Sequence, residues 1–286
     1  MKKILVPTDF SEAGNWAVEV ASIIAKKAYA QINLLHVVEQ PTSESFSVEG
    51  QVGNFSDWED KLFTFKLIEK NKAQLAEVAD RLTRQGITVK TSLRMGNPFH
   101  GMKTVIAEYK VDLVIMGTVG RSRFEEILIG SNTEKVVRHS KCPVLTVHQK
   151  PSVNNFKKIV YATSMSEDEK DFAPVLREMQ EIFGSEIYIV RINTPMNFRA
   201  DTEVIKLMDA FAKRLHLKNY TLSVFNDHSE EEGILHFASS IGADLIAMAT
   251  HGRTGFAHVL VGSIAEDVVN HASKPVLTYV TQNSYQ

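Results

Sequence analysis

The chain has 286 residues, 44% of them hydrophobic, which is enough for two compact domains. Its 32 basic and 34 acidic residues leave a net charge of −2 without a long basic run, which argues against a nucleic-acid-binding protein. The single cysteine excludes an intrachain disulfide, and no apolar run approaches a signal peptide or a membrane span, so we expect a cytoplasmic protein that contacts no membrane.

In the first half, short apolar runs alternate with segments of helical period, which is typical of a parallel sheet. Strands are predicted near Ile4–Pro7, Ile32–Val38, Val89–Leu93, Leu113–Gly117 and Val144–His148. Helices are predicted at about Ser11–Tyr29, Trp58–Gln85, Pro98–Tyr109 and Asn132–His139. The polar segment Gln40–Asp57 is expected to be disordered or a plain surface excursion, or else a lid beside a ligand site.

The second half repeats the first. Residues 112–147 align without a gap on residues 244–279, with about half of the positions identical, and Lys2–Glu12 aligns on Lys157–Glu167. Strands are predicted near Ile159–Ala162, Ile187–Ile192, Leu222–Phe225, Leu245–Ala249 and Val276–Val280. We therefore expect two domains, residues 1–149 and 156–286, joined by a short linker.

The first helix of the second half carries two local signals. Ser166 and Glu169 have the spacing of a capping box, which predicts a helix start. Pro174 lies well inside the helical pattern, so it should either kink the helix or mark a displaced start.

A glycine pattern after the fourth strand indicates an anion site. Gly117 and Gly120 are followed by Gly130 and Ser131 at the start of the fourth helix. Free amides and the positive end of the helix dipole favour phosphate at such a position. Arg121 and Arg123 add cationic side chains to the same loop, and Ser131 with Glu134 predicts another capping box.

The first strand ends in Pro7-Thr8-Asp9, at the edge where open parallel sheets bind ligands. The Asp9 carboxylate suits ribose hydroxyls, although it could instead cap the first helix. The spacing alone does not decide whether a nucleotide binds here, because the pattern is neither a P-loop nor the dinucleotide motif. The ten histidines show no metal-ligating spacing, so no metal ligands are predicted.

These motifs together resemble the universal stress protein family in its tandem form: KKILVPTDFSE, LLHVVE, DLVIMGTVGRS, the run G-x2-G-x9-G-S and CPVLTV occur in order, and most of them recur in the second half. The resemblance implies two Rossmann-like α/β domains, each an open five-stranded parallel sheet of order 3-2-1-4-5 with helices on both faces. It also implies ATP, with AMP or ADP as alternatives and Mg²⁺ accompanying the nucleotide.

By the same resemblance, Asp9 would hold the ribose. The adenine and sugar would lie among Pro7, Thr8, Val37 and Met116. The phosphates would be held by Gly117, Gly120, Gly130, Ser131 and Asn132, beside Arg121 and Arg123.

The second half departs from this pattern, with Ser164 at the position of Asp9, Ala249 at Gly117 and Arg191 at His36. We therefore expect about one nucleotide per chain, bound in the first domain. The predicted role is a stress-response sensor or regulator without efficient turnover. The alternatives are a slow ATP hydrolase or nucleotide-transferring enzyme, and an interaction scaffold that binds no nucleotide.

The terminal strands of the two halves, at residues 143–148 and 275–281, are apolar and similar to each other. The resemblance puts them at sheet edges, and an unpaired edge favours aggregation. We expect them to pair with each other, which gives an intramolecular pseudo-dimer. Association of two chains into a homodimer is a further possibility.

Overall fold

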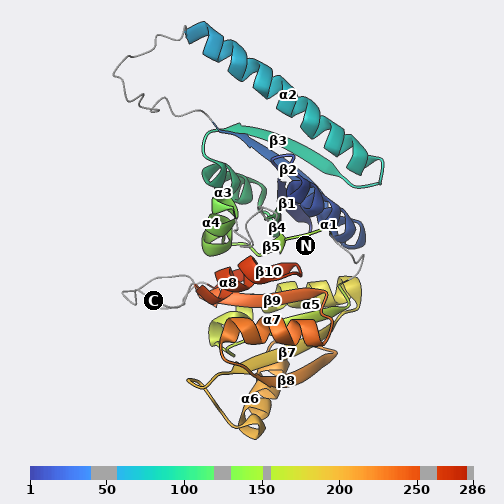
Figure 1. Ribbon diagram of the computed structural model, residues 1–286. Helices are drawn as coiled ribbons and strands as arrows, with labels where there is room; N and C mark the ends of the chain where they lie inside the picture. The colour runs from blue at the N-terminus through green and yellow to red at the C-terminus, as the bar shows by residue number, and fades with distance from the viewer. Residues whose placement is uncertain (40–56, 119–129, 151–155, 252–262, 282–286) are drawn as a thin grey trace, which may run out of the picture.

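The computed structural model describes residues 1–39, 57–118, 130–150, 156–251 and 263–281, and its strands form one continuous ten-stranded sheet (Figure 1). The strands are β1 Lys3–Pro7, β2 Gln31–Val38, β3 Val89–Met95, β4 Leu113–Gly117, β5 Val144–Val147, β6 Lys158–Ala162, β7 Glu186–Asn193, β8 Tyr220–Asn226, β9 Leu245–His251 and β10 Val276–Thr281. The helices are α1 Glu12–Ala28, α2 Asp57–Thr83, α3 Pro98–Tyr109, α4 Ser131–His139, the 3-10 helix η1 Glu167–Asp171, α5 Ala173–Phe183, α6 Asp201–Arg214, α7 Glu230–Ser240 and α8 Ser263–His271.

The sheet runs in the order β3-β2-β1-β4-β5-β10-β9-β6-β7-β8. Within each half the strands are parallel and follow the predicted order 3-2-1-4-5. In the first half, strands are added on one side of β1 up to β3, and the chain then crosses to the other side of β1 to form β4 and β5. The direction in which strands are added therefore reverses between β1 and β4, and it does so between β6 and β9 in the second half. Those reversals place a crevice at the carboxyl ends of the two strands.

Helices cover both faces of the sheet, as predicted. One face packs against α1, α2, α5 and α6, and the other against α3, α4, α7 and α8. Successive strand side chains point to opposite faces, so Ile4 and Val6 join the first core while Leu5 joins the second. Each core continues from one half of the chain into the other.

The two halves are joined by an antiparallel pairing of β5 with β10, which confirms the predicted pairing of terminal strands. Leu145 lies opposite Leu277, its equivalent in the other repeat. On either side, the Thr146 hydroxyl donates to the Val276 carbonyl at 3.2 Å and the Thr278 hydroxyl donates to the Val144 carbonyl at 3.3 Å. The matching bonds describe an approximate two-fold axis through the leucine pair.

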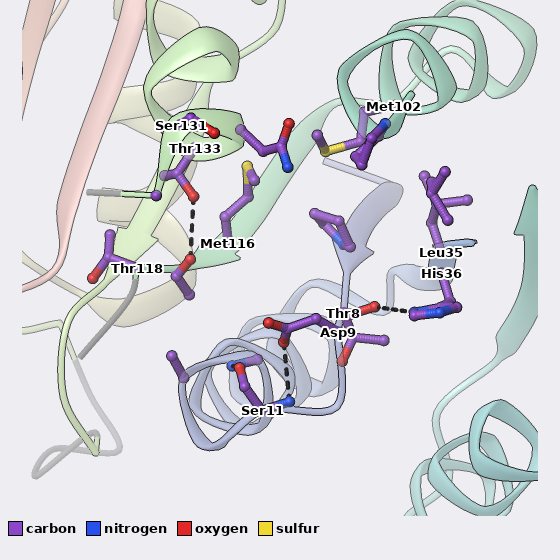
Figure 2. Close-up of a pocket in the computed structure, with 18 of the residues that line it drawn as sticks. Thr8, Asp9, Ser11, Leu35, His36, Met102, Met116, Thr118, Ser131 and Thr133 are labelled. Carbon is purple, nitrogen blue, oxygen red and sulfur yellow. Dashed lines mark hydrogen bonds between the residues drawn. The ribbon is translucent and has the colours of Figure 1, made fainter. Parts of the chain in front are cut away.

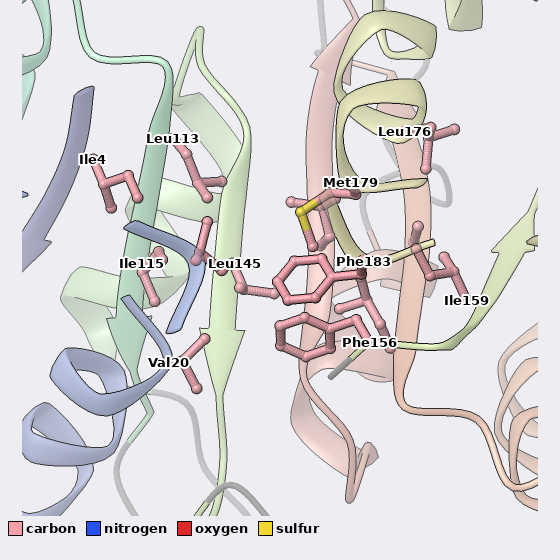
Figure 3. Packing of buried hydrophobic residues seen from close by; sticks show 14 of the residues in the cluster. Ile4, Val20, Leu113, Ile115, Leu145, Phe156, Ile159, Leu176, Met179 and Phe183 are labelled. Carbon is pink, nitrogen blue, oxygen red and sulfur yellow. The ribbon is translucent and has the colours of Figure 1, made fainter. Parts of the chain in front are cut away.

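Side chains beyond these strands extend the contact between the halves. Figure 3 shows Leu145 of β5 facing Phe183 of α5 and Phe156, within one apolar cluster. At the other face, the Arg138 guanidinium donates two hydrogen bonds to the Glu266 carboxylate, at 2.6 and 2.5 Å. Bidentate geometry of this kind fixes orientation as well as attracting charge.

The first helix of the second half begins late. The predicted capping box of Ser166 and Glu169 is present, but it opens the 3-10 helix η1 rather than an α-helix. Helix α5 then starts at Ala173, with Pro174 in its first turn. Proline is tolerated there because the first amides of a helix have no intrahelical acceptor, so Pro174 marks a displaced start and not a kink.

Two expectations are limited by the described ranges. Residues 40–56, which contain nearly all of the predicted insertion, lie outside them, and Asp57 is the first residue of α2. Within the described ranges, none of the helices has the length and apolar content that a membrane crossing needs.

Candidate functional site

A cavity of about 300 Å³ opens at the carboxyl ends of β1 and β4 (Figure 2). It brings together nine of the predicted site residues, which are Pro7, Thr8, Asp9, Val37, Met116, Gly117, Gly130, Ser131 and Asn132. The other three, Gly120, Arg121 and Arg123, lie outside the described residues. Figure 2 shows Asp9 and Ser11 on one side of the cavity, Ser131 and Thr133 on the opposite side, and Met116 between them.

The loop after β1 leaves the Asp9 carboxylate open to a ligand. Its Oδ1 atom accepts a hydrogen bond from the Ser11 amide at 3.0 Å. The N-cap of α1 is Ser11 itself, whose hydroxyl accepts from the Gly14 amide at 3.1 Å. Among the described residues no group donates to Asp9 Oδ2, and the residue is exposed. Asp9 is therefore not the helix cap, which was the alternative interpretation of this residue.

Residues that the sequence analysis did not assign to the site hold this loop. His36 Nδ1 lies 2.7 Å from the Thr8 carbonyl oxygen, and the Phe10 ring lies 4.7 Å from the His36 ring. Phe10 has a left-handed φ of 64°, which is a strained conformation for a bulky residue. The Thr8 hydroxyl accepts from the Phe10 amide at 3.0 Å and so stabilises this conformation.

Gly117, at the end of β4, is needed for helix packing. A β-carbon at this position would lie 2.2 Å from the Ala13 carbonyl oxygen, so any side chain would displace α1. The sequence analysis explained this glycine by assigning it to the anion site. The structure gives a different reason, which is that α1 crosses directly over it.

Helix α4 begins at the cavity with an N-terminus that lacks a side-chain cap. Its N-cap is Gly130, and no side chain of the described residues makes a capping hydrogen bond there. The predicted capping box of Ser131 with Glu134 is therefore wrong: Ser131 is already the first helical residue, and Glu134 pairs with Arg138 at 3.1 Å. The uncapped amides retain their capacity to bind an anion.

The neighbouring residues Thr118 and Thr133 are further lining residues that the sequence analysis missed. The Thr133 hydroxyl donates to the Gly117 carbonyl at 3.3 Å and ties α4 to β4. Thr118 is nearly fully buried, and its hydroxyl lies 3.0 Å from His148 Nδ1. Neither residue carries a local sequence signal, because their positions depend on the approach of two distant segments.

The second domain has a cavity of about 250 Å³ at the equivalent place, at the ends of β6 and β9. The predicted replacements Ser164, Arg191 and Ala249 all line it. The aligned partner of α1's first turn is the 3-10 helix η1, and β9 carries Ala249 where β4 has Gly117.

A buried carboxylate, that of Glu169, lies behind this second cavity with 1% of the residue exposed. Its Oε2 accepts from the Tyr161 hydroxyl at 2.6 Å and the Thr163 hydroxyl at 2.7 Å. Its Oε1 accepts from the Ser164 hydroxyl at 2.9 Å and the Ser166 amide at 3.0 Å. Burial, together with the Glu169 charge, raises the pKa of Tyr161 well above its usual value, so the phenol stays a donor.

Comparisons with known proteins identify one family for both halves of the chain. The model of the universal stress protein family matches residues 1–148 and again residues 155–279. Universal stress protein MJ0577 of Methanocaldococcus jannaschii is 33% identical over 158 residues, which cover 53% of this chain and 97% of that protein. Universal stress protein MJ0531 of the same organism is 33% identical over 146 residues, which cover 51% of this chain and 81% of that protein.

A solved structure extends the likeness to both halves. The crystal structure of a universal stress protein from Archaeoglobus fulgidus matches with a TM-score of 0.77 at 21% identity. The match covers 97% of this chain and 98% of the Archaeoglobus chain. That likeness shows the fold. The two Methanocaldococcus proteins each match about half of this chain, as expected for a chain with two copies of the domain.

Proposed function

The chain belongs to the universal stress protein family, and we propose that its first domain binds an adenine nucleotide and acts as a sensor or regulator without efficient turnover. One observation carries the proposal. The first-domain cavity has a carboxylate with an open oxygen at one side and an uncapped helix N-terminus at the other. A nucleotide has the complementary pattern, with hydroxyl donors on the ribose and negative charge on the phosphates.

In this proposal Asp9 accepts hydrogen bonds from the ribose hydroxyls. Pro7, Thr8, Val37 and Met116 surround the adenine and the sugar, and the cavity's size lies at the lower end of the range for small-molecule sites. The phosphates lie against the start of α4, at Gly130, Ser131 and Asn132, beside Gly117. Gly120, Arg121 and Arg123 are assigned to the phosphates from the sequence pattern alone.

The proposed metal is the Mg²⁺ that accompanies ATP. No group of side chains among the described residues has the composition of a metal site, so the phosphates supply most of the ligands in this proposal. ATP is the first choice of nucleotide, with ADP and AMP as alternatives.

Binding without turnover is proposed because no base is evident among the described residues on the phosphate side. Phosphoryl transfer to water requires a group that positions the attacking water. The acidic residues that line the described cavity are Asp9 and Glu39, which follow β1 and β2 and are not on α4. The slow hydrolase remains the alternative that an activity assay would reveal.

Titration calorimetry with ATP tests the proposal. We expect about one ATP per chain, and replacing Gly130 by Leu should abolish binding because the new side chain would occupy the phosphate position. Gly130 has a φ of −60°, which leucine adopts without strain, so the fold should persist. The matched control is Gly262→Leu at the equivalent position of the second domain, which should leave the affinity unchanged. Absence of binding to ATP, ADP and AMP would favour the scaffold.

A further inference from the structure

The two domains each carry a carboxylate beside the loop that follows their first strand, but at different positions. In the first domain it belongs to Asp9, in the loop itself. In the second domain the loop carries Ser164, and the carboxylate comes from Glu169 on η1. Glu169 aligns with Gly14 of the first domain.

The loops themselves have the same conformation, so the change is confined to these side chains. Phe10 and Met165 occupy equivalent positions with φ of 64° and 65°. In each loop the threonine hydroxyl accepts from the amide two residues later, at 3.0 Å in the first domain and 2.8 Å in the second. In the first domain the Ser11 amide donates to Asp9. In the second domain the equivalent amide, that of Ser166, donates to Glu169.

The two carboxylates differ in what they can offer a ligand. Asp9 is exposed and has one oxygen that no described residue uses. Glu169 is buried, and both of its oxygens are saturated by four donors. The hydroxyls of Thr163 and Ser164, which line the cavity, both donate to Glu169 and so do not donate to a ligand in the cavity. At the place that Asp9 has in the first domain, a ribose entering the second cavity would meet Ser164 and, behind it, the buried charge of Glu169. Among the described residues, the carboxylate that lines this cavity is that of Glu230, which lies at the start of α7 and already accepts from the Asn197 side-chain amide at 2.6 Å.

We propose that Glu169 is the specificity-determining residue that excludes ribose-bearing ligands from the second domain, because it replaces the ligand-facing carboxylate by an internal one. The proposal rests on the nucleotide function proposed for the first domain. Ala249 is a weaker explanation for the exclusion, because the packing of α1 is enough to account for the glycine at its counterpart, Gly117. The glycine and serine positions of the phosphate pattern are kept in the second half, at Gly252, Gly262 and Ser263.

The test transfers the first-domain arrangement to the second. The variant Ser164→Asp/Glu169→Gly restores a loop carboxylate and removes the internal one, and titration calorimetry should then count about two ATP per chain instead of one. Ser164→Asp alone is the matched control, and it should stay at one because Glu169 still holds the donors. If the loss of Glu169 leaves Tyr161 unpaired and the variant folds poorly, adding Tyr161→Phe removes the orphaned hydroxyl.

A second measurement isolates the new site from the old one. With Gly130→Leu added to abolish binding in the first domain, the swapped chain should still bind one ATP, now in the second domain. A folded swap that binds no more ATP than the wild type would overturn the role of Glu169. If the wild type binds no nucleotide, the function proposed for the first domain is what fails, and a gain of one site in the swap would still support Glu169.

The reciprocal change gives an independent check in the first domain. A β-carbon at Gly14 would lie 3.0 Å from Asp9 Oδ1 and 3.1 Å from Thr8 Oγ1, so Gly14→Glu places a carboxylate in competition with Asp9 for the same donors. We expect at least a tenfold loss of ATP affinity with the secondary structure retained. Wild-type affinity in a folded Gly14→Glu chain would contradict the proposal.

Discussion

Asp9 keeps its carboxylate available because another residue, Ser11, caps α1. Replacing Asp9 by Asn should weaken ATP binding by roughly 1.5–3 kcal/mol, about ten- to 150-fold, since hydrogen bonds to a charged group are lost. The asparagine oxygen can still accept from the Ser11 amide, so the melting temperature should hardly change. Calorimetry and thermal melting measure the two effects.

Ser164→Ala, at the equivalent position of the second domain, is the control for this prediction, and it should leave the ATP affinity unchanged. The contrary outcome for Asp9→Asn is a lower melting temperature with unaltered affinity. That result would make Asp9 a structural residue of the loop.

His148 gives a prediction about pH. Burial lowers the pKa of His148 to about 4, and its ring lies between the hydroxyls of Thr118 and Thr146. An unfolded histidine has a pKa near 6.5, so between about pH 6.5 and 4 the unfolded chain binds the proton more readily than the folded chain. The contribution of neutral His148 to the free energy of unfolding is therefore fully present above about pH 6.5, and it is lost as the pH falls toward 4.

Valine occupies the equivalent position in the second domain, at Val280, which suggests the variant His148→Val. Its melting temperature should fall less than that of the wild type between pH 7 and pH 5. The exposed His100 serves as a control, because His100→Gln should keep the wild-type pH dependence. Parallel curves for the wild type and His148→Val would exclude this contribution.

At the scale of elements, the helix starts differ in what caps them. The hydroxyl of Ser229 accepts from the Glu232 amide at 3.1 Å and caps α7, whereas Ser131 follows the N-cap of α4 and caps nothing. We expect Ser229→Ala to cost about 1 kcal/mol of unfolding free energy and Ser131→Ala to change it by less than about 0.5 kcal/mol. Urea denaturation of the two variants compares them directly. Equal losses would show that the Ser131 hydroxyl stabilises α4 after all.

At the scale of the whole molecule, β5 and β10 give each half the edge partner that it would otherwise lack. A fragment of residues 1–149 therefore exposes β5 and should form a homodimer through it. In that dimer Glu134 is the natural partner of Arg138, because Glu134 is the repeat equivalent of Glu266. Light scattering after size exclusion measures the mass of the fragment beside that of the full chain.

The corresponding fragment of residues 156–286 should dimerise through β10 and provides the matched control. A fragment 1–149 that stays monomeric and soluble at high concentration would count against the edge pairing as its association mode. The same experiment tests the domain boundaries 1–149 and 156–286, which stay a prediction, since a cut inside a domain would leave a fragment that does not fold.

The sequence by itself determined the tandem architecture, the order of strands and helices, and the gathering of Asp9, Gly130 and Ser131 at one end of the sheet. These features follow from local periodicity, from the repeat, and from the rule that parallel strands bring their carboxyl ends to one edge. The resemblance to a family then supplied the strand order and the candidate ligand.

Only the tertiary structure decided the roles of Gly117, Ser131 and Glu169. Gly117 is explained by Ala13, which is far away in the sequence, so no local pattern could identify the contact. Ser131 and Glu169 both matched capping boxes, and spacing alone could not show that one box is absent while the other carboxylate binds four donors. Which donors a side chain reaches depends on how distant segments pack, and that packing separates a cavity with an open carboxylate from one whose carboxylate is already bound.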